Sequence, residues 1–249
     1  MPRTGRKVDE TVSKKRTIIT VIQAVIGLFV VLCGAWLVMK VLGYHQAQQV
    51  YSSIEAAYAS EVGDSAIESP VDFKALQQEY PDVVAWLKME DVDVSYPIVQ
   101  GSDNEYFLHH DPTGQDNIDG SIFLDYRNKS LDTDLYALVY GHNMLDESMF
   151  GQLDNYVSED FYQKGSGSFY IYTPAGAYRY KIFAVNVVDP SDDAYQVGFG
   201  NTQAFNAFVR QLKENSMYDT GVEVSGSDNV VTLSTCSDVN RLVLSAKRM

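Results

Sequence analysis

The sequence is poor in cysteine and in basic residues, and it lacks the short motifs of nucleotide-binding and serine-dependent enzymes. Lys and Arg together number 19 against 33 Asp and Glu, so the chain carries a net charge of -14. Such an acidic chain lacks the cationic surface that neutralises phosphates, which excludes nucleic acid as a partner. No P-loop, GxGxxG or GxSxG sequence occurs, and the last of these absences argues against an α/β-hydrolase. A disordered chain is excluded because 45% of the residues are apolar and 12% are aromatic.

One long uncharged segment, residues 17–39, lies near the N-terminus. As a helix rising about 1.5 Å per residue it can cross a hydrocarbon core of about 30 Å, whereas a signal peptide has an apolar core of only about 7 to 15 residues. We therefore predict a single transmembrane anchor over residues 17–42. Residues 1–16 carry six basic side chains against two acidic ones, so the positive-inside rule places them in the cytoplasm and the rest of the chain outside the cell.

Composition divides the outer part of the chain into a linker region and one folded domain. Residues 43–59 are rich in helix formers but have no broad apolar stripe, which is typical of a stalk. Residues 61–70 have the Gly, Ser and acidic content of a flexible linker. We therefore expect a stalk and linker over 43–70 and a single domain over 71–249, which is long enough to bury a substantial core.

The expected domain is mainly β. It opens with a short helix over 72–80 capped by Asp72 and a second helix over 82–87 that begins after Pro81. Seven segments rich in Val, Ile, Leu, Tyr and Phe predict strands at 92–99, 121–126, 135–140, 168–172, 177–188, 230–235 and 242–246. One longer helix is indicated by apolar residues at helical spacing, with Asn201 or Thr202 as its cap; they are Phe205, Phe208, Val209 and Leu212. Short strands without regularly alternating helices favour an antiparallel barrel or sandwich.

The outer part of the chain contains one thiol. Cys33 lies within the predicted anchor, so Cys236 has no partner for an internal disulfide. A lone thiol outside the cell is usually either well buried or kept for its reactivity. Cys236 ends a predicted strand and Arg241 opens the next, and a cation beside a thiol favours the reactive thiolate.

A histidine occupies a similar position on another strand. His142 follows a glycine where the strand predicted over 135–140 enters a loop. If these strands are neighbours, Cys236, His142 and Arg241 meet at one rim as nucleophile, general acid and base, and positive donor for an oxyanion. On the residues alone, a core cysteine, a surface histidine and a strand-edge arginine stay open as structural interpretations.

His109 and His110, followed by Asp111, form the only other cluster of chemical interest. No HExxH, CxxC or spaced third ligand accompanies them, so we assign them to a loop and expect neither a metal nor a cofactor.

Several segments together resemble one protein family. TLSTC (232–236) followed by Arg241, with YGHNM (140–144) upstream, resembles the sortases, which are membrane-anchored cysteine transpeptidases of Gram-positive bacteria. PDVVAWL, YPIVQGSDNEYFLHHD and GSIFLDYRN, together with the helix around 205–216, resemble the class B branch, and the resemblance covers residues 72–249. It implies a closed β-barrel of seven to eight strands with N-terminal helices and one long inserted helix. Only four residues separate Cys236 from Arg241, fewer than in many sortases.

The resemblance also implies an activity. Cys236 would attack the C-terminal sorting motif of a secreted protein after its Thr residue and form a thioacyl-enzyme, with His142 as acid and base and Arg241 at the oxyanion. Ser234 and Thr235 are expected to contact the substrate. The acceptor is expected to be an amine of cell-wall peptidoglycan or its precursor.

Three alternatives remain open at this point. A pilin-polymerising sortase would use a Lys acceptor, and a membrane-anchored cysteine peptidase would use water. Papain-like peptidases place their Cys before their His, whereas here His142 precedes Cys236 and the third residue is Arg241. A non-enzymatic adhesion domain would not require an unpaired Cys beside an Arg. We therefore favour the transpeptidase that attaches proteins to the cell wall.

Overall fold

The computed structural model describes residues 5–59, 69–236 and 240–249. The chain divides into two compact units, Met1–Gln46 and Ala47–Met249, and each is described by itself. The linker expected over 61–70 falls almost entirely outside the described residues and stays a prediction.

The first unit contains the N-terminal part of one long helix, α1 (Gly5–Tyr58). Its large apolar side chains from Ile19 to Leu42 are exposed. The helix is long and apolar enough to cross a membrane, by length and composition. A helix is therefore present where the anchor is predicted.

The last turns of α1 belong to the folded unit and not to a separate stalk. Ala47, Tyr51 and Ile54 are at most 5% exposed, and they follow the i, i+4, i+7 spacing of one helix face. Tyr51 packs edge-on against Tyr96 with ring centroids 5.4 Å apart. The compact unit thus begins at Ala47, earlier than the boundary expected at residue 71. A stripe of three side chains is too narrow to dominate the sequence pattern, yet it is wide enough to hold the helix on the domain.

The segment after the linker contains one expected helix and one unexpected strand. Helix α2 (Phe73–Glu79) begins where Asp72 accepts a hydrogen bond from the backbone N–H of Ala75 at 3.0 Å, as predicted. The prediction of a second helix over 82–87 is wrong, because Val83–Met89 forms strand β1. β1 is hydrogen-bonded on both sides, to β2 and β5. These two pairings favour a strand for a segment whose local sequence alone is also compatible with a helix.

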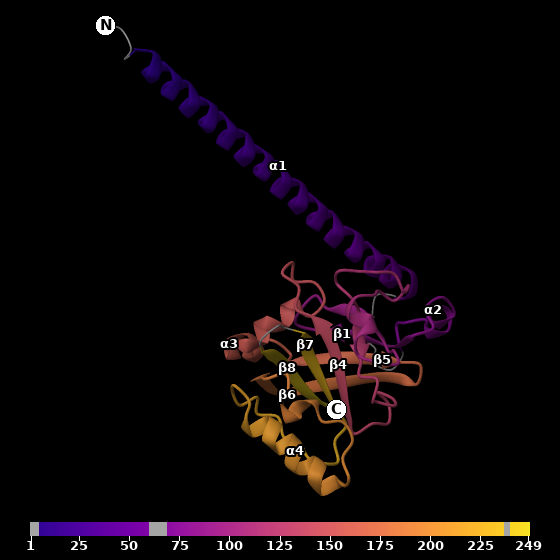
Figure 1. The fold of residues 1–249 in the computed structure, drawn as a ribbon. Coiled ribbons are helices and arrows are strands. Elements are labelled where there is room, and N and C mark those ends of the chain that lie inside the picture. The colour runs from indigo at the N-terminus through magenta and orange to yellow at the C-terminus, as the bar shows by residue number, and fades with distance from the viewer. Residues whose placement is uncertain (1–4, 60–68, 237–239) are drawn as a thin grey trace. The chain divides into compact units, whose positions relative to one another are not determined.

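Eight strands close into a barrel in the order β1-β2-β3-β4-β7-β8-β6-β5 (Figure 1). The remaining strands are β2 (Ser95–Val99), β3 (Ile122–Leu124), β4 (Tyr136–His142), β5 (Ser168–Thr173), β6 (Gly176–Val188), β7 (Val230–Cys236) and β8 (Arg241–Arg248). The predicted closed barrel is confirmed. The expectation of an entirely antiparallel barrel is wrong, because the β2–β3 pair and the β4–β7 pair are both parallel.

The helices after α2 lie in the connections between strands. Helix α4 (Thr202–Glu214) is the predicted long helix, capped by Asn201, and its four predicted apolar residues are all buried. In Figure 1 it lies outside the barrel beside β6. Shorter elements are η1 (Tyr106–Leu108), η2 (Gly151–Val157), α3 (Glu159–Lys164) and η3 (Asp193–Tyr195).

Candidate active site

Three strand ends meet at one edge of the barrel. β4 ends at His142, β7 ends at Cys236, and the two residues are direct Cα partners in the parallel ladder. β7 and β8 form an antiparallel ladder that runs to Ser234 opposite Val243, so Arg241, two residues before Val243, reaches the same edge. The backbone therefore brings the three predicted residues together. The side chain of Cys236 and residues 237–239 lie outside the described part of the chain.

His142 is held by a backbone carbonyl. Its imidazole is half-buried, and Nε2 lies 2.7 Å from the carbonyl oxygen of Leu108, at the end of η1. A carbonyl oxygen only accepts hydrogen bonds, so Nε2 carries the proton and donates it. In the neutral ring Nδ1 is then the nitrogen without a proton, which suits it to exchange one with a reacting group.

The glycine before His142 is required by packing. A Cβ atom at Gly141 would lie 2.4 Å from Cδ1 of Ile122 and 2.7 Å from Cδ2 of Phe150. No other residue fits there without moving the core, so the end of β4 is fixed directly beside the histidine.

Arg241 lines a cleft at this edge of the barrel. The cleft has a volume of about 360 Å³, and its walls are Asn104, Glu105, Leu108, Phe123, Tyr140, Pro190, Tyr195, Ser234 and Arg241. Among the described residues, no hydrogen-bond or ion-pair partner of the Arg241 guanidinium is found. Its planar set of donors is therefore available to a bound carbonyl or oxyanion.

A buried carboxylate organises one wall of the cleft. Asp125 receives two hydrogen bonds from the Arg127 guanidinium, at 2.8 and 2.7 Å, one from the Tyr140 hydroxyl at 2.8 Å and one from Asn104 at 2.9 Å. Burial alone would raise the pKa of Asp125, but the hydrogen bonds from Arg127, Tyr140 and Asn104 outweigh it and hold that pKa below its usual range. Tyr140 and Asn104 are thus fixed in position at the cleft surface.

Sequence reasoning missed this wall. The GSIFLDYRN segment contributed only to the family resemblance, and Asn104 and Tyr140 were not singled out. The available signal was an acidic residue, Asp125, directly after an apolar strand and two residues before Arg127.

The two predicted substrate-binding residues occupy different environments. Ser234 lines the cleft, and its hydroxyl lies 2.8 Å from the hydroxyl of Tyr195. Thr235 is 1% exposed, and its hydroxyl accepts a hydrogen bond from the backbone N–H of Leu242 at 3.1 Å. Thr235 therefore supports the rim by joining β7 to β8, while Ser234 faces the cleft.

The histidine pair occupies a loop, as assigned from sequence. His110 stacks on Tyr106 with ring centroids 3.9 Å apart, and its Nε2 lies 3.3 Å from Asp116. Among the described residues, no group of three or more His, Cys, Asp or Glu side chains suited to a metal ion occurs.

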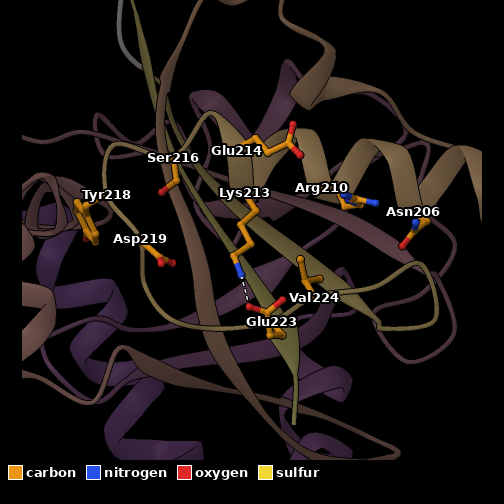
Figure 2. Close-up of a pocket in the computed structure, with 9 residues that line it drawn as sticks. All are labelled: Asn206, Arg210, Lys213, Glu214, Ser216, Tyr218, Asp219, Glu223 and Val224. Carbon is orange, nitrogen blue, oxygen red and sulfur yellow. Dashed lines mark hydrogen bonds and ion pairs between the residues drawn. The ribbon is translucent and has the colours of Figure 1, made fainter.

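A larger and more polar cavity, of about 640 Å³, lies along α4 and the segment that follows it (Figure 2). Figure 2 shows Lys213 extending from α4 to Glu223, with which it forms an ion pair at 2.7 Å. None of the residues that line this cavity belongs to the rim of β4, β7 and β8. The smaller cleft at Arg241 is therefore the candidate active site, because it alone of these two cavities adjoins the three strand ends.

Comparisons with known proteins identify the family and the fold. The family model described as the sortase domain matches residues 87–249. Sortase B of Listeria monocytogenes is 32% identical over 233 residues, which cover 90% of this chain and 93% of that protein. The structure of sortase B from Bacillus anthracis in complex with AAEK1 has a TM-score of 0.74 at 32% identity, covering 84% of this chain and 98% of that one. A Staphylococcus aureus sortase B–substrate complex has a TM-score of 0.68 at 30% identity, covering 71% of this chain and 84% of that one.

The chain belongs to the sortase family of cysteine transpeptidases. Within that family it is a class B sortase, the class of the relatives named above. The family, the class and the enzyme type predicted from the sequence are confirmed.

Proposed function

We propose that this sortase cleaves the C-terminal sorting motif of secreted proteins after Thr and transfers the acyl group to an amine of cell-wall peptidoglycan. The proposal rests on one observation above all: the β4–β7 register pairs His142 with Cys236 at the rim of the cleft that Arg241 lines. A nucleophile, an acid and base, and a cationic donor at one edge form the set that acyl transfer requires.

The first half of the reaction forms the thioacyl-enzyme. The Cys236 thiolate attacks the Thr carbonyl carbon, a C–S bond forms, and the negative charge moves to the carbonyl oxygen. The Arg241 guanidinium donates hydrogen bonds to that oxyanion. The C–N bond then breaks, and protonated His142 gives its proton to the leaving amine.

The second half transfers the acyl group to the acceptor. An amine attacks the thioester carbonyl, and neutral His142 takes the proton that the amine loses. The C–S bond breaks and returns the Cys236 thiolate, so the enzyme regains its starting protonation state. Dividing one difficult acyl transfer into two steps is the advantage of the covalent intermediate.

The cleft is where we place the sorting motif. Asn104, Ser234 and Tyr195 offer polar atoms for peptide groups, and Leu108 and Phe123 offer apolar wall. We propose that Ser234 contacts the substrate directly and that Thr235 acts on the same surface by holding the rim. The related Staphylococcus aureus enzyme has been solved as a substrate complex, which supports the binding of a substrate by this fold.

We further propose that α1 anchors the enzyme at the cell membrane, with residues 1–16 in the cytoplasm and the barrel outside. The apolar helix and the basic flank support this orientation. Secreted substrates and peptidoglycan precursors are available on that side.

The function is tested with the detergent-solubilised full chain, a library of sorting-motif peptides and candidate amines. Mass spectrometry should find a peptide–amine product whose new bond joins the Thr carbonyl to the amine. Preference for a peptidoglycan peptide over a pilin Lys peptide supports wall attachment, and the reverse indicates pilus assembly. Hydrolysis alone with every amine would identify a peptidase and overturn the proposal.

The two cysteines supply a matched pair of variants. Cys236→Ala should abolish both turnover and the thioacyl adduct, which hydroxylamine releases from the wild-type enzyme. Cys33→Ala, in the apolar part of α1, should leave both unchanged. Turnover retained in Cys236→Ala would remove the covalent mechanism.

A further inference from the structure

The hydrogen bond between His142 and Leu108 selects one tautomer of the histidine. The Leu108 carbonyl oxygen, 2.7 Å from Nε2, requires a donor at that nitrogen. Only the Nε2–H tautomer satisfies it, and this tautomer leaves Nδ1 to exchange protons in the reaction. The orientation of one backbone carbonyl therefore determines which nitrogen of His142 is reactive.

A glycine fixes the position of that carbonyl. Gly120 has a φ of +55°, and a Cβ atom there would lie 2.5 Å from the Leu108 oxygen and 2.8 Å from the Leu108 carbonyl carbon. The backbone of Gly120 is therefore in close contact with the peptide group that binds His142. Two backbone hydrogen bonds on either side close the loop, from Ser121 to Phe107 and from Asn117 to His109, both at 2.8 Å.

Gly120 is itself held by a hydrogen bond from the last turns of α1. The hydroxyl of Tyr51 donates a hydrogen bond to the Gly120 carbonyl oxygen and also lies 3.3 Å from the Ser121 hydroxyl. Tyr51 is 5% exposed. A continuous series of contacts thus runs from Tyr51 to Gly120, from Gly120 to the Leu108 carbonyl, and from that carbonyl to His142.

We propose that Gly120 and Tyr51 are positioning residues for catalysis, which hold the Leu108 carbonyl where it fixes His142 as the Nε2–H tautomer. The proposal rests on the proposed role of His142 as acid and base. Neither residue lines the cleft, so both act through the histidine and not on the substrate. Displacing the Leu108 carbonyl removes the acceptor of Nε2–H, and Nδ1 is then protonated in part of the molecules. A histidine in the wrong tautomer cannot accept a proton at the reacting position.

The decisive variant is Gly120→Ala, because its new methyl group presses directly on the Leu108 carbonyl. Gly114→Ala is the matched control: Gly114 lies in the same loop with a φ of +79°, but a Cβ there meets only the Tyr106 hydroxyl, at 3.4 Å. Both changes place a side chain at a positive φ, and only one reaches Leu108. Tyr51→Phe is a third variant, which keeps the buried ring and removes the hydroxyl that donates to Gly120 and lies near the Ser121 hydroxyl.

Two readouts are measured on the detergent-solubilised full chain. Nitrogen-15 NMR of labelled histidine, at a pH at which His142 is neutral, reports the tautomer, and the His142 signal among the four histidines is identified by its loss in His142→Gln. Steady-state transpeptidation separates kcat from KM. The wild type and Gly114→Ala should show Nε2–H and equal kcat. Gly120→Ala should show a mixture of tautomers and a kcat at least about tenfold lower, with KM nearly unchanged, and Tyr51→Phe a smaller loss in the same direction.

The outcomes separate this proposal from the proposed function. Wild-type tautomer and wild-type kcat in Gly120→Ala or in Tyr51→Phe would overturn the positioning role while leaving the sortase mechanism intact. Should Gly120→Ala fail to fold, Tyr51→Phe alone decides the question. Wild-type kcat in His142→Gln would overturn the role of His142, and the NMR tautomer would still report on the Leu108 contact.

Discussion

His142 and Cys236 face each other as Cα partners in a parallel ladder. Parallel strands end at the same edge of a sheet, whereas antiparallel neighbours end at opposite edges. The parallel pairing of β4 with β7 is therefore what allows two residues that each terminate a strand to meet. Strand β8, which is antiparallel to β7, begins with Arg241 at the same edge.

Replacing His142 should remove acid–base catalysis without unfolding the domain. We expect His142→Ala to lower the transpeptidation rate by about 10² or more, because a positioned acid or base contributes on that scale. His109→Ala is the control, since His109 is exposed and its side chain has no hydrogen bond to any described residue. A near-normal rate in His142→Ala, or an equal loss in both variants, would assign the proton transfer to another group.

Arg241 is expected to act through the shape of its guanidinium as well as through its charge. Lys supplies the charge without the planar fork of donors, so Arg241→Lys should lose much of the activity and Arg241→Ala more, on the order of 10² to 10³ in rate. An arginine that only solubilises a strand edge would change stability by about 0.5 kcal/mol or less and leave the rate unchanged.

The control for Arg241 is Arg210→Ala on α4, an exposed arginine that lines the other cavity. Transpeptidation rates and thermal midpoints should be measured for all three variants. A large rate loss with unchanged melting in the Arg241 variants alone supports a role at the oxyanion. Wild-type rates in both Arg241 variants would leave the site without its positive element.

Most of the strands and the identity of the three candidate residues could be predicted from the sequence, because both depend on local patterns. Short β-rich segments between turn residues mark the strands, and Cys236 and Arg241 stand at opposite ends of one short connection. Which strands become neighbours is decided by pairing across the whole barrel. Local sequence therefore could not predict the parallel pairs β2–β3 and β4–β7. Nor could it predict that residues 83–89 form a strand paired on both sides instead of a helix.

The cleft wall and the boundary of the domain were missed for a related reason. The position of Asn104 depends on a hydrogen bond to Asp125, 21 residues away in the chain. Tyr51 reaches its partner Gly120 from a helix that sequence composition describes as a stalk. Contacts across such separations leave no periodic signal, so only the folded structure reveals them.

The contacts of α1 predict where the chain can be truncated. A chain starting at residue 43 keeps Ala47, Tyr51 and Ile54, whereas a chain starting at residue 61 loses all three. Burying a large apolar side chain contributes about 1.5 to 3 kcal/mol, so the shorter chain should be less stable by about 3 kcal/mol or more.

Chemical denaturation and transpeptidation assays on the two truncated chains, beside the full chain in detergent, test this expectation. The longer chain should match the full chain in turnover. Equal stability and equal activity of the two truncated chains would show that the end of α1 is dispensable, as expected of a stalk.

Asp119 should make the stability of the domain depend on pH. Its side chain is 0% exposed, and neither carboxyl oxygen has a hydrogen-bond partner among the described residues. Burial, and after it the nearby charge of Asp146, raises the pKa of Asp119 from its ordinary value of 3.8 to about 7. The folded protein therefore holds a proton that the unfolded chain releases at much lower pH.

The direction of the effect follows from this difference in bound protons. Between about pH 4 and pH 7 the unfolded state binds fewer protons at this site than the folded state, so the free energy of unfolding falls as pH rises, by at most about 1.4 kcal/mol per pH unit. Above about pH 7 both states are ionised and the penalty is constant. Asp119→Asn cannot ionise and should escape this loss, gaining stability relative to the wild type as the pH is raised from 5 to 8.

Urea denaturation midpoints of the full chain in detergent at pH 5, 6, 7 and 8 test this prediction. The control is Asp93→Asn, at an exposed position, whose midpoints should follow the wild type at every pH. The difference between Asp119→Asn and the wild type should grow between pH 5 and pH 7 and then level off, because the titration of Asp119 ends there. If the two midpoints instead change in parallel across this range, Asp119 is already ionised in the folded protein at pH 5, and the carboxylate must have a partner that lowers its pKa.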